Sequence, residues 1–171
     1  YYGDEIGMSN VPIPPDRMQD PFEKNVPGLG LGRDPCRTPM QWDESPNAGF
    51  STAAPWLAVS DDYNVVNVRA EEADPQSILT LYRRLLTLRR AHQALEVGKY
   101  EPVATTGHLL AYIREAEGER FLIALNFGAD PYELSLDSLA TRGRVLLSTH
   151  LDRVEDASVR GVGLRANEGV I

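Results

Sequence analysis

The spacing of hydrophobic residues divides the chain into three stretches. Residues 1 to about 73 show few periodic apolar runs and hold most of the 12 prolines. This pattern predicts a long loop region, and loops of more than about 15 residues are usually functional or belong to a larger scaffold. Residues 1–7 are typical of a strand end that runs into a turn. Because the chain opens on this segment without a methionine, we expect it to begin inside a longer protein.

The clearest helical signal lies in residues 74–95. Asp74 is a good N-cap residue, and Pro75 suits the first helical position, where its missing N–H has no partner to lose. Apolar residues then recur at helical spacing and predict an amphipathic helix that needs a core to lie against. They are Ile78, Leu79, Leu81, Tyr82, Leu85, Leu86 and Leu88. Arginines occupy the other face, which we interpret as solvated rather than as a docking surface.

From about residue 97 the hydrophobic period becomes two, which is typical of strands. Residues 109–114 and 121–127 alternate in this way, and Glu117-Gly118 between them predicts a hairpin turn. Further strands are expected at residues 99–104, 132–136, 144–149 and near Val170. Five or six short antiparallel strands in about 75 residues predict a small β-sandwich.

Composition narrows the class of protein. The 171 residues are 42% hydrophobic and 25% charged, as in a folded globular chain, and no apolar run is long enough to cross a bilayer. Twenty-five acidic against 17 basic residues give a net charge of −8, so binding to nucleic acid is not expected. The single cysteine, Cys36, excludes an intrachain disulfide and fits a cytoplasmic location. With three scattered histidines it builds no zinc site, and no metal or cofactor is expected.

Most acidic residues, the histidines and the cysteine are weak candidates for chemistry. Asp4 and Glu5 are adjacent, and adjacent residues of a strand point to opposite faces, so they cannot flank one scissile bond. The pairs Asp43-Glu44 and Asp61-Asp62 lack the ligand spacing of a calcium loop and are interpreted as turn residues. Ordinary surface or structural roles are expected for Cys36, His92, His108 and His150.

Residues 32–43 differ in chemistry from the rest of the loop region. They place two guanidinium groups, two carboxylates and an indole within a short stretch that prolines keep stiff. Sugar sites use such groups, because planar polar forks fix the directions of hydroxyls and an aromatic face covers the apolar side of a pyranose. A buried salt-bridge corner explains the same residues nearly as well.

The order of these residues resembles that of a known family. Residues 33–43, Arg-Asp-Pro-Cys-Arg-Thr-Pro-Met-Gln-Trp-Asp, resemble the signature after the last barrel strand in α-glucosidases and oligo-1,6-glucosidases of the α-amylase superfamily. Residues 1–8, Tyr-Tyr-Gly-Asp-Glu-Ile-Gly-Met, resemble the eighth barrel strand of these enzymes, and residues 77–90 resemble their last barrel helix. Further similar segments follow in the family's order at residues 47–51, 55–57, 64–68 and 165–169.

The resemblance implies an α+β fold that is part of a larger one. The family has a (β/α)8 barrel, which takes about 250 residues, followed by an antiparallel β-sandwich. This chain can therefore hold only the last strand, the long loop and the last helix of the barrel. We expect this C-terminal barrel end in residues 1–95 and the C-terminal β-sandwich domain in residues 96–171. The exposed surface of a barrel end could lead such a fragment to self-associate.

The resemblance also implies retaining hydrolysis of α-glucosidic bonds in short saccharides. In the family an Asp nucleophile forms a glycosyl-enzyme, a Glu serves as acid/base, and a second Asp stabilises the transition state. These residues follow barrel strands four, five and seven, upstream of this chain, so no catalytic residue is assigned to it. The expected partner is an α-glucoside oligosaccharide, bound by the complete protein.

The resemblance does carry over a substrate contact. The first arginine of the family's motif reaches the glucose in the −1 subsite, which implies that Arg33 binds substrate. Fixing the hydroxyls of that ring helps its distortion toward the transition state. Asp34 and Arg37 are expected to support Arg33 from behind, and Trp42 to pack the loop rather than stack on sugar. A structural salt bridge is the alternative role of Arg33.

Two other functions stay open. A transglycosylating relative, of the trehalose synthase or sucrose isomerase type, shares residues 37–42 and differs in upstream loops. A stand-alone carbohydrate-binding module is the second alternative, although such a module would have no reason to keep a barrel end.

Overall fold

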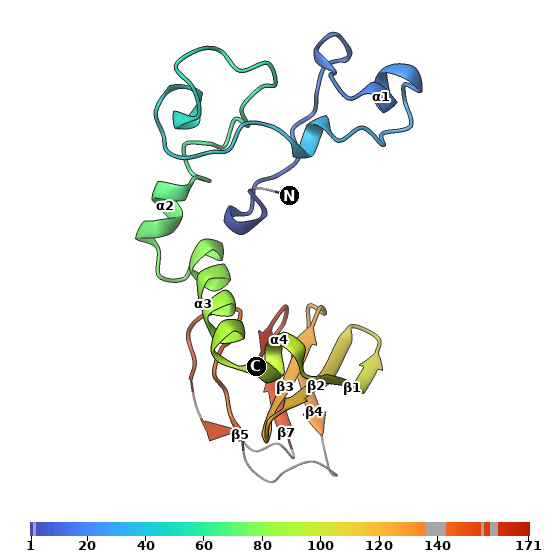
Figure 1. Ribbon diagram of the computed structural model, residues 1–171, viewed down its shortest axis with the longest axis vertical. Coiled ribbons are helices and arrows are strands. Elements are labelled where there is room, and N and C mark those ends of the chain that lie inside the picture. Colours follow the sequence, from blue (N-terminus) through green and yellow to red (C-terminus); the bar gives the residue numbers. More distant parts are fainter. Residues whose placement is uncertain (2, 136–142, 155, 158–160) are drawn as a thin grey trace. The chain divides into compact units, whose positions relative to one another are not determined.

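The computed structural model describes residues 1, 3–135, 143–154, 156–157 and 161–171. Figure 1 shows short helices and long connections in the first half of the chain and strands in the second. The chain divides into two compact units, residues 1–80 and 81–171, and the boundary lies within helix α3 (Ile78–Ala91). The sequence predicts a domain boundary at residue 95, where the last barrel helix of the family would end. That boundary stays a prediction.

The first unit consists of short helices joined by long loops, as its proline content predicts. Proline stands in the first turn of four of these helices, where its fixed φ favours a helical start. The 3₁₀ helices are η1 (Asp4–Ile6), η2 (Pro15–Arg17), η3 (Asp34–Cys36) and η4 (Pro46–Gly49), and the α-helices are α1 (Pro21–Asn25) and α2 (Val68–Ala73).

The opening segment contains the predicted turn but no strand pairing. The turn is η1, and it lies between Gly3 (φ 89°) and Gly7 (φ 69°), which adopt the left-handed conformation that glycine tolerates best. A strand needs a neighbour for its backbone hydrogen bonds, and the described residues of this segment pair with none.

Buried polar side chains fix the loops of the first unit, because its apolar core is small. That core contains Ile6, Met40 and Leu79, with Met8 and Val68 against it. Gln41 is fully buried and donates its side-chain amide to the carbonyl of Val66. Asn67 is also buried; its Oδ1 accepts from the backbone N of Ala70 at 2.8 Å and so caps α2.

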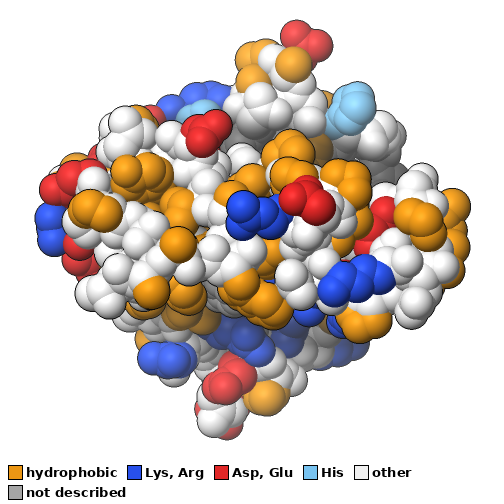
Figure 2. All heavy atoms as spheres, turned by 90° about the horizontal axis from the view of Figure 1, so that it is seen from above, with side chains coloured by type: hydrophobic (Ala, Val, Ile, Leu, Met, Phe, Trp, Pro, Cys, Tyr) orange, Lys and Arg blue, Asp and Glu red, His pale blue; other side chains and the backbone are white. Residues whose placement is uncertain are grey.

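Large apolar side chains are exposed on the first unit. They are Phe22, Val26, Leu29, Leu31, Trp42, Phe50, Trp56 and Val65. Figure 2 shows hydrophobic side chains spread over much of the face drawn there, interrupted by acidic and basic groups. Extended apolar surface of this kind usually marks a contact with other protein.

The predicted amphipathic helix is present as α3, but its cap differs from the prediction. Ser77, not Asp74, caps the N-terminus of α3. Its Oγ accepts a hydrogen bond from the backbone N of Thr80 at 3.1 Å. Asp74 instead follows the end of α2 and accepts from the backbone N of Gln76 at 2.8 Å, which forms a local turn. Among the described residues no helix is long and apolar enough to span a membrane.

The second unit contains a four-stranded antiparallel sheet in the order β1-β2-β3-β8. Its strands are β1 (Lys99–Thr106), β2 (Leu109–Ala116), β3 (Glu119–Asn126) and β8 (Gly169–Val170). The predicted hairpin between β2 and β3 is confirmed, and both turn residues, Glu117 (φ 51°) and Gly118 (φ 82°), have the positive φ of a type I′ turn.

Shorter strands complete the second unit. They are β4 (Tyr132–Ser135), paired with β7 (Gly161–Leu164), and β5 (Gly143–Arg144), paired with β6 (Asp156–Ala157). The predicted strand at 144–149 is wrong for most of its length, because after β5 only a bridge between Ser148 and Val170 remains. The strands β6 and β7 were missed because they have only two and four residues, too few for a recognisable period. Residue 136, the predicted end of β4, lies outside the described residues.

Both faces of the four-stranded sheet are covered. One face packs against β4 and β7 in a common core that contains Leu109, Ala111, Ala124, Leu134, Val145, Val162, Leu164 and Val170. The other face turns toward the end of α3 and the helix α4 (Gln93–Val97) and borders a cavity of about 430 Å³, lined mainly by apolar side chains such as Leu85, Leu95 and Ile123. This explains why both sets of alternating residues in β3 are apolar.

A buried ion network closes the sheet unit at its C-terminal end. Glu168 is 1% exposed, and its Oε1 accepts from Ser148 Oγ at 2.6 Å and from Arg165 Nη2 at 2.7 Å. Its Oε2 accepts from Arg153 Nη2 at 3.2 Å. Burial works against ionisation of Glu168, but the hydrogen bonds from Arg165 and Ser148 outweigh it and lower its pKa to about 2. Asp152 holds the far side of Arg165 through two further hydrogen bonds, at 2.6 and 2.7 Å.

We predict that Glu168→Gln destabilises the chain by about 3 kcal/mol, because it removes the charge from a buried carboxylate that Arg165, Arg153 and Ser148 bind. The free energy of unfolding from a urea titration measures this. Glu119→Gln is the matched control, since Glu119 pairs with His92 at the surface and its loss should cost less than about 0.5 kcal/mol.

The same variant should change the acid sensitivity of the chain. The folded-state pKa of Glu168 lies below its ordinary value of 4.5, so its ionisation stabilises the fold above that pH and the stabilisation is lost as pH falls toward 2. Glu168→Gln should therefore lose less stability than the wild type between pH 4.5 and 2. An equal loss in both proteins would contradict the assigned role of Glu168.

We also predict that the two halves differ in hydrogen exchange. Backbone amides of β2 and β3 should exchange at least about tenfold more slowly than those of residues 9–66, because the latter have few buried apolar contacts. Exchange followed by mass spectrometry on a dilute monomer measures this. Equally slow exchange in both halves would refute it, and protection of residues 9–66 that appears only at high concentration would indicate self-association.

Candidate functional site

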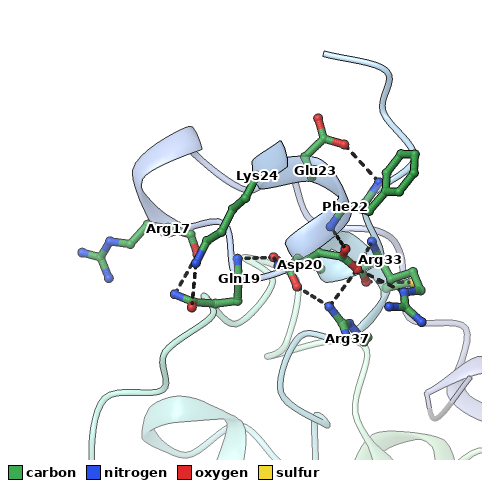
Figure 3. Close-up of polar contacts among 11 residues, drawn as sticks. Arg17, Gln19, Asp20, Phe22, Glu23, Lys24, Arg33 and Arg37 are labelled. Atoms are coloured by element: carbon green, nitrogen blue, oxygen red, sulfur yellow. Dashed lines mark hydrogen bonds and ion pairs between the residues drawn. The ribbon is translucent and has the colours of Figure 1, made fainter. Parts of the chain in front are cut away.

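The motif at residues 33–43 begins where two loops of the first unit meet. Asp20 ends an extended segment and caps α1, because its Oδ1 accepts from the backbone N of Phe22 at 2.8 Å. Pro21 follows in the first helical position. The chain then returns through a glycine-containing loop to η3, which starts at Asp34. Arg33 and Arg37 flank η3 and lie next to the N-terminal end of α1 (Figure 3).

The carboxylate of Asp20 joins both arginines. Its Oδ2 accepts from three donors: the backbone N of Arg33 at 3.2 Å, the Nε of Arg33 at 3.0 Å and the Nη2 of Arg37 at 3.1 Å. Asp20 is 1% exposed, whereas the side chain of Arg33 is 60% exposed. Arg33 therefore forms a salt bridge at its base and also meets the Tyr1 side chain, while most of its side chain stays exposed.

Asp34 contacts this arrangement from the other side; its role as a support of a substrate-binding Arg33 stays a prediction. Its Oδ1 accepts from Arg37 Nη2 at 2.6 Å, and its Oδ2 accepts from the backbone N of Asp20 at 2.8 Å and from that of Gln19. Asp34 and Arg37 thus reach Arg33 through Asp20, which positions the carboxylate that Arg33 binds.

Two carboxylates and two guanidinium groups neutralise one another in this cluster, those of Asp20, Asp34, Arg33 and Arg37. The pKa of Asp20 is lowered to about 2, mainly by the hydrogen bond from the backbone of Phe22 and then by Arg33. Burial opposes the ionisation of Asp34, but hydrogen bonds from the backbones of Gln19 and Asp20 and from Arg37 still lower its pKa. The hydrogen bond to Asp20 raises the pKa of Arg33. Two carboxylates and two guanidinium groups are all charged at neutral pH.

A second buried carboxylate fixes the loop that leads to Arg33. Glu23 is 7% exposed; its Oε1 accepts from the backbone N of Gly28 at 3.0 Å and its Oε2 from that of Gly32 at 3.1 Å. A Cβ at Gly32 would lie 2.8 Å from the Cβ of Glu23, so only glycine allows this close approach. The position of Arg33 in the chain is therefore held on both sides.

Aromatic side chains lie in the same part of the chain and are largely exposed. Trp42 is 51% exposed, so the loop covers about half of it, and its predicted packing role stays a prediction. Phe50 (48%) and Trp56 (67%) border a hollow of about 190 Å³ together with Asp34 and Arg37. A guanidinium group, carboxylates and exposed aromatic rings are the groups that bind a saccharide.

The remaining acidic pairs have local structural roles. Glu5 accepts from the backbone N of Gly3 at 2.8 Å, and the backbone N of Gly7 donates to the carbonyl of Asp4 at 3.2 Å, which closes the first turn. Asp43 accepts from the backbone N of Ser45 at 2.9 Å, as predicted for a turn residue, and also pairs with Arg69. Within the described ranges no group of three or more His, Cys, Asp or Glu side chains is placed to hold a metal ion.

The histidines and the cysteine add nothing to the cluster around Asp20. His92 pairs with Glu119 at 2.8 Å and packs its ring against Phe121 in the second unit. Cys36 donates its thiol to the carbonyl of Arg33 at 3.1 Å.

Sequence reasoning missed Asp20 and Glu23. Residues 20–23, Asp-Pro-Phe-Glu, carry the signature of a helix start, with an N-cap residue and an acidic residue three positions later. That signal could have placed α1. It could not have revealed the ion pairs of Asp20, since its partners lie 13 and 17 residues further along the chain.

Comparison with known proteins gives a consistent result. The α-amylase catalytic domain family matches residues 1–98. A glucan 1,6-α-glucosidase of Streptococcus pneumoniae is 38% identical over 154 residues, which cover 80% of this chain and 29% of that protein. An oligo-1,6-glucosidase of Parageobacillus thermoglucosidasius is 31% identical over 185 residues, which cover 96% of this chain and 33% of that protein.

Solved structures resemble the chain over nearly its whole length. The trehalulose synthase of Pseudomonas mesoacidophila superposes with a TM-score of 0.85 and 30% identity over 98% of this chain and 34% of that one. A variant of trehalulose synthase in complex with sucrose gives a TM-score of 0.86. The chain spans about a third of the length of the relatives that it matches.

Proposed function

The chain belongs to the α-amylase family, and we propose that it forms the C-terminal part of a retaining glycoside hydrolase that cleaves α-glucosidic bonds of short saccharides. In this proposal residues 1–95 are the end of the catalytic barrel and residues 96–171 its C-terminal β-sandwich domain. The family match to residues 1–98 and the antiparallel sheets after them support this division. A cytoplasmic location completes the proposal and fits a sequence with one cysteine.

The observation that carries the proposal is the position of Arg33. Its Nε is fixed on a buried carboxylate while most of its side chain is exposed, which is the arrangement expected of a residue that binds a ligand from a rigid support. A guanidinium can donate two parallel hydrogen bonds to neighbouring hydroxyls of one sugar ring. Asp34 and Arg37 contribute through Asp20, and none of these residues serves as nucleophile or acid/base.

The chemical role of Arg33 follows from the geometry of a retaining reaction. The glucose ring in the −1 subsite flattens as positive charge develops at its anomeric carbon, and its hydroxyls move with the ring. A donor that is held in place contributes most when it fits the flattened ring better than the relaxed one. The nucleophile and the acid/base belong to the part of the protein upstream of this chain.

A transglycosylating enzyme is the second candidate function. The trehalulose synthase structures favour it, since they match 98% of this chain at 30% identity. Arg33 would bind the same glucose ring there, and only the acceptor of the glucosyl group would differ. The family match to a catalytic domain favours either enzyme over a stand-alone carbohydrate-binding module.

We predict that the 171-residue chain by itself does not turn over α-glucosides. Positioning of substrate gives little rate without a nucleophile and an acid/base. Release of p-nitrophenol from p-nitrophenyl α-glucoside by the purified chain, compared with an Arg33→Ala preparation made in the same way, measures this. Turnover that Arg33→Ala removes would show that the chemistry lies within these residues.

In the full-length protein, Arg33→Ala should lower kcat/KM for an α-glucoside by at least about tenfold, because a charge-assisted contact contributes about 1.5–3 kcal/mol. Part of the loss should appear in kcat, since the contact strengthens as the ring flattens. Arg33→Lys should recover little of it, because one ammonium cannot replace a planar fork. Steady-state kinetics and the melting temperature are measured on the same preparation.

The alternative role of Arg33 as a structural salt bridge gives a different result. The Arg33→Ala enzyme would then melt at a lower temperature, and the folded fraction would keep its normal kcat/KM. That outcome would remove Arg33 from the substrate site.

A further inference from the structure

We infer that Asp20 is a positioning residue, which orients the guanidinium of Arg33 toward the substrate from behind. The inference rests on the proposed function, because it gives the orientation of Arg33 a purpose. It names a residue outside the 33–43 motif, in a different segment of the chain.

The Asp20 carboxylate accepts hydrogen bonds from several donors at once. Asp20 Oδ1 is held by the backbone of Phe22, so the side chain cannot turn away from α1. Its Oδ2 then binds both the backbone N and the Nε of Arg33. Two donors of the same residue on one oxygen fold the arginine back on its own backbone and limit its rotamers.

Arg33 contacts Asp20 on one edge and is exposed over most of its side chain. The Nε of Arg33 faces Asp20, whose side chain is 1% exposed, whereas the side chain of Arg33 is 60% exposed. Arg37 differs, because its side chain is 34% exposed and its Nη2 binds both Asp20 and Asp34. In Figure 3 both arginines, which flank the short helix η3, approach Asp20 from the same stretch of chain.

The negative charge of Asp20 lies against two positive charges, those of Arg33 and Arg37. Without the Asp20 carboxylate, Asp34 would be the remaining aspartate of the cluster beside the two guanidinium groups. Repulsion between these like charges would then move Arg33, the more exposed of the two, toward solvent. Since the pKa of Asp20 is about 2, its charge is constant throughout the working range of most enzymes. Any effect of removing it should therefore be independent of pH above about 4.

Two variants separate this role from the capping of α1. Asp20→Asn keeps the shape of the side chain and an oxygen for the N–H of Phe22 but removes the charge. Asp20→Ser keeps a good N-cap hydroxyl and is too short to reach either arginine. In the full-length protein both should lower kcat/KM for an α-glucoside by about tenfold to a hundredfold, because a misplaced binding group costs rate.

A double-mutant cycle with Arg33→Ala gives the decisive readout. If Asp20 acts through Arg33, Asp20→Asn should change kcat/KM by less than about twofold once Arg33 is absent. The kcat/KM ratio of wild type to Asp20→Asn should also stay constant from pH 5 to 8. The matched control is Asp152→Asn, which removes an aspartate of similarly low pKa from the salt bridge with Arg165 in the second unit and should leave kcat/KM within about twofold.

The outcomes distinguish this inference from the function on which it rests. A wild-type protein that turns over no α-glucoside overturns both. An active wild type with additive effects of Asp20→Asn and Arg33→Ala overturns the positioning role alone, as does an Asp20→Ser enzyme of normal kcat/KM. Variants that lose activity only in proportion to their folded fraction, judged by melting temperature and by comparison with Asp152→Asn, also overturn it.

Discussion

The buried carboxylate of Asp20 is the contact on which the geometry of the first unit's site depends. This unit has little regular structure and a small apolar core, so few forces fix the path of its loops. A carboxylate that is removed from water must be compensated fully, and here α1, Arg33 and Arg37 supply the donors. The requirement ties the start of α1 to the segment around η3 and holds the base of Arg33 against Asp20.

The second unit also contains a buried carboxylate that arginines bind, but there the contact stabilises the sheet. Glu168 is also a buried carboxylate with two arginines, but both of its partners bind further groups: Arg165 is held by Asp152, and Arg153 donates to the carbonyl of Gly163. The network is therefore closed on itself and stabilises the sheet. The network around Asp20 is open on the side of Arg33, and an open network on a rigid support is suited to binding.

This contrast follows the extent of the match to the α-amylase family, to which the chain belongs. The family match covers the unit with the open network and ends near the start of the sheet. The sheet brings its own core and hairpin, which depend on local contacts. The exposed apolar side chains of the first unit fit a segment that packs against other protein, and the chain spans only about a third of its relatives.

The sequence by itself determined the elements whose signals are local. The 3.6-residue spacing in residues 78–88 predicted α3, the period of two predicted β1 to β3, and Glu117-Gly118 predicted their turn, because each depends on neighbours a few residues apart. The chemistry of the 33–43 motif could also be read from residue types alone. Only the tertiary structure decided that Arg33 rests on Asp20 and that Ser77 rather than Asp74 caps α3. These choices depend on the path of loops that no periodic pattern encodes, because a buried charge takes whichever partner the fold brings near it.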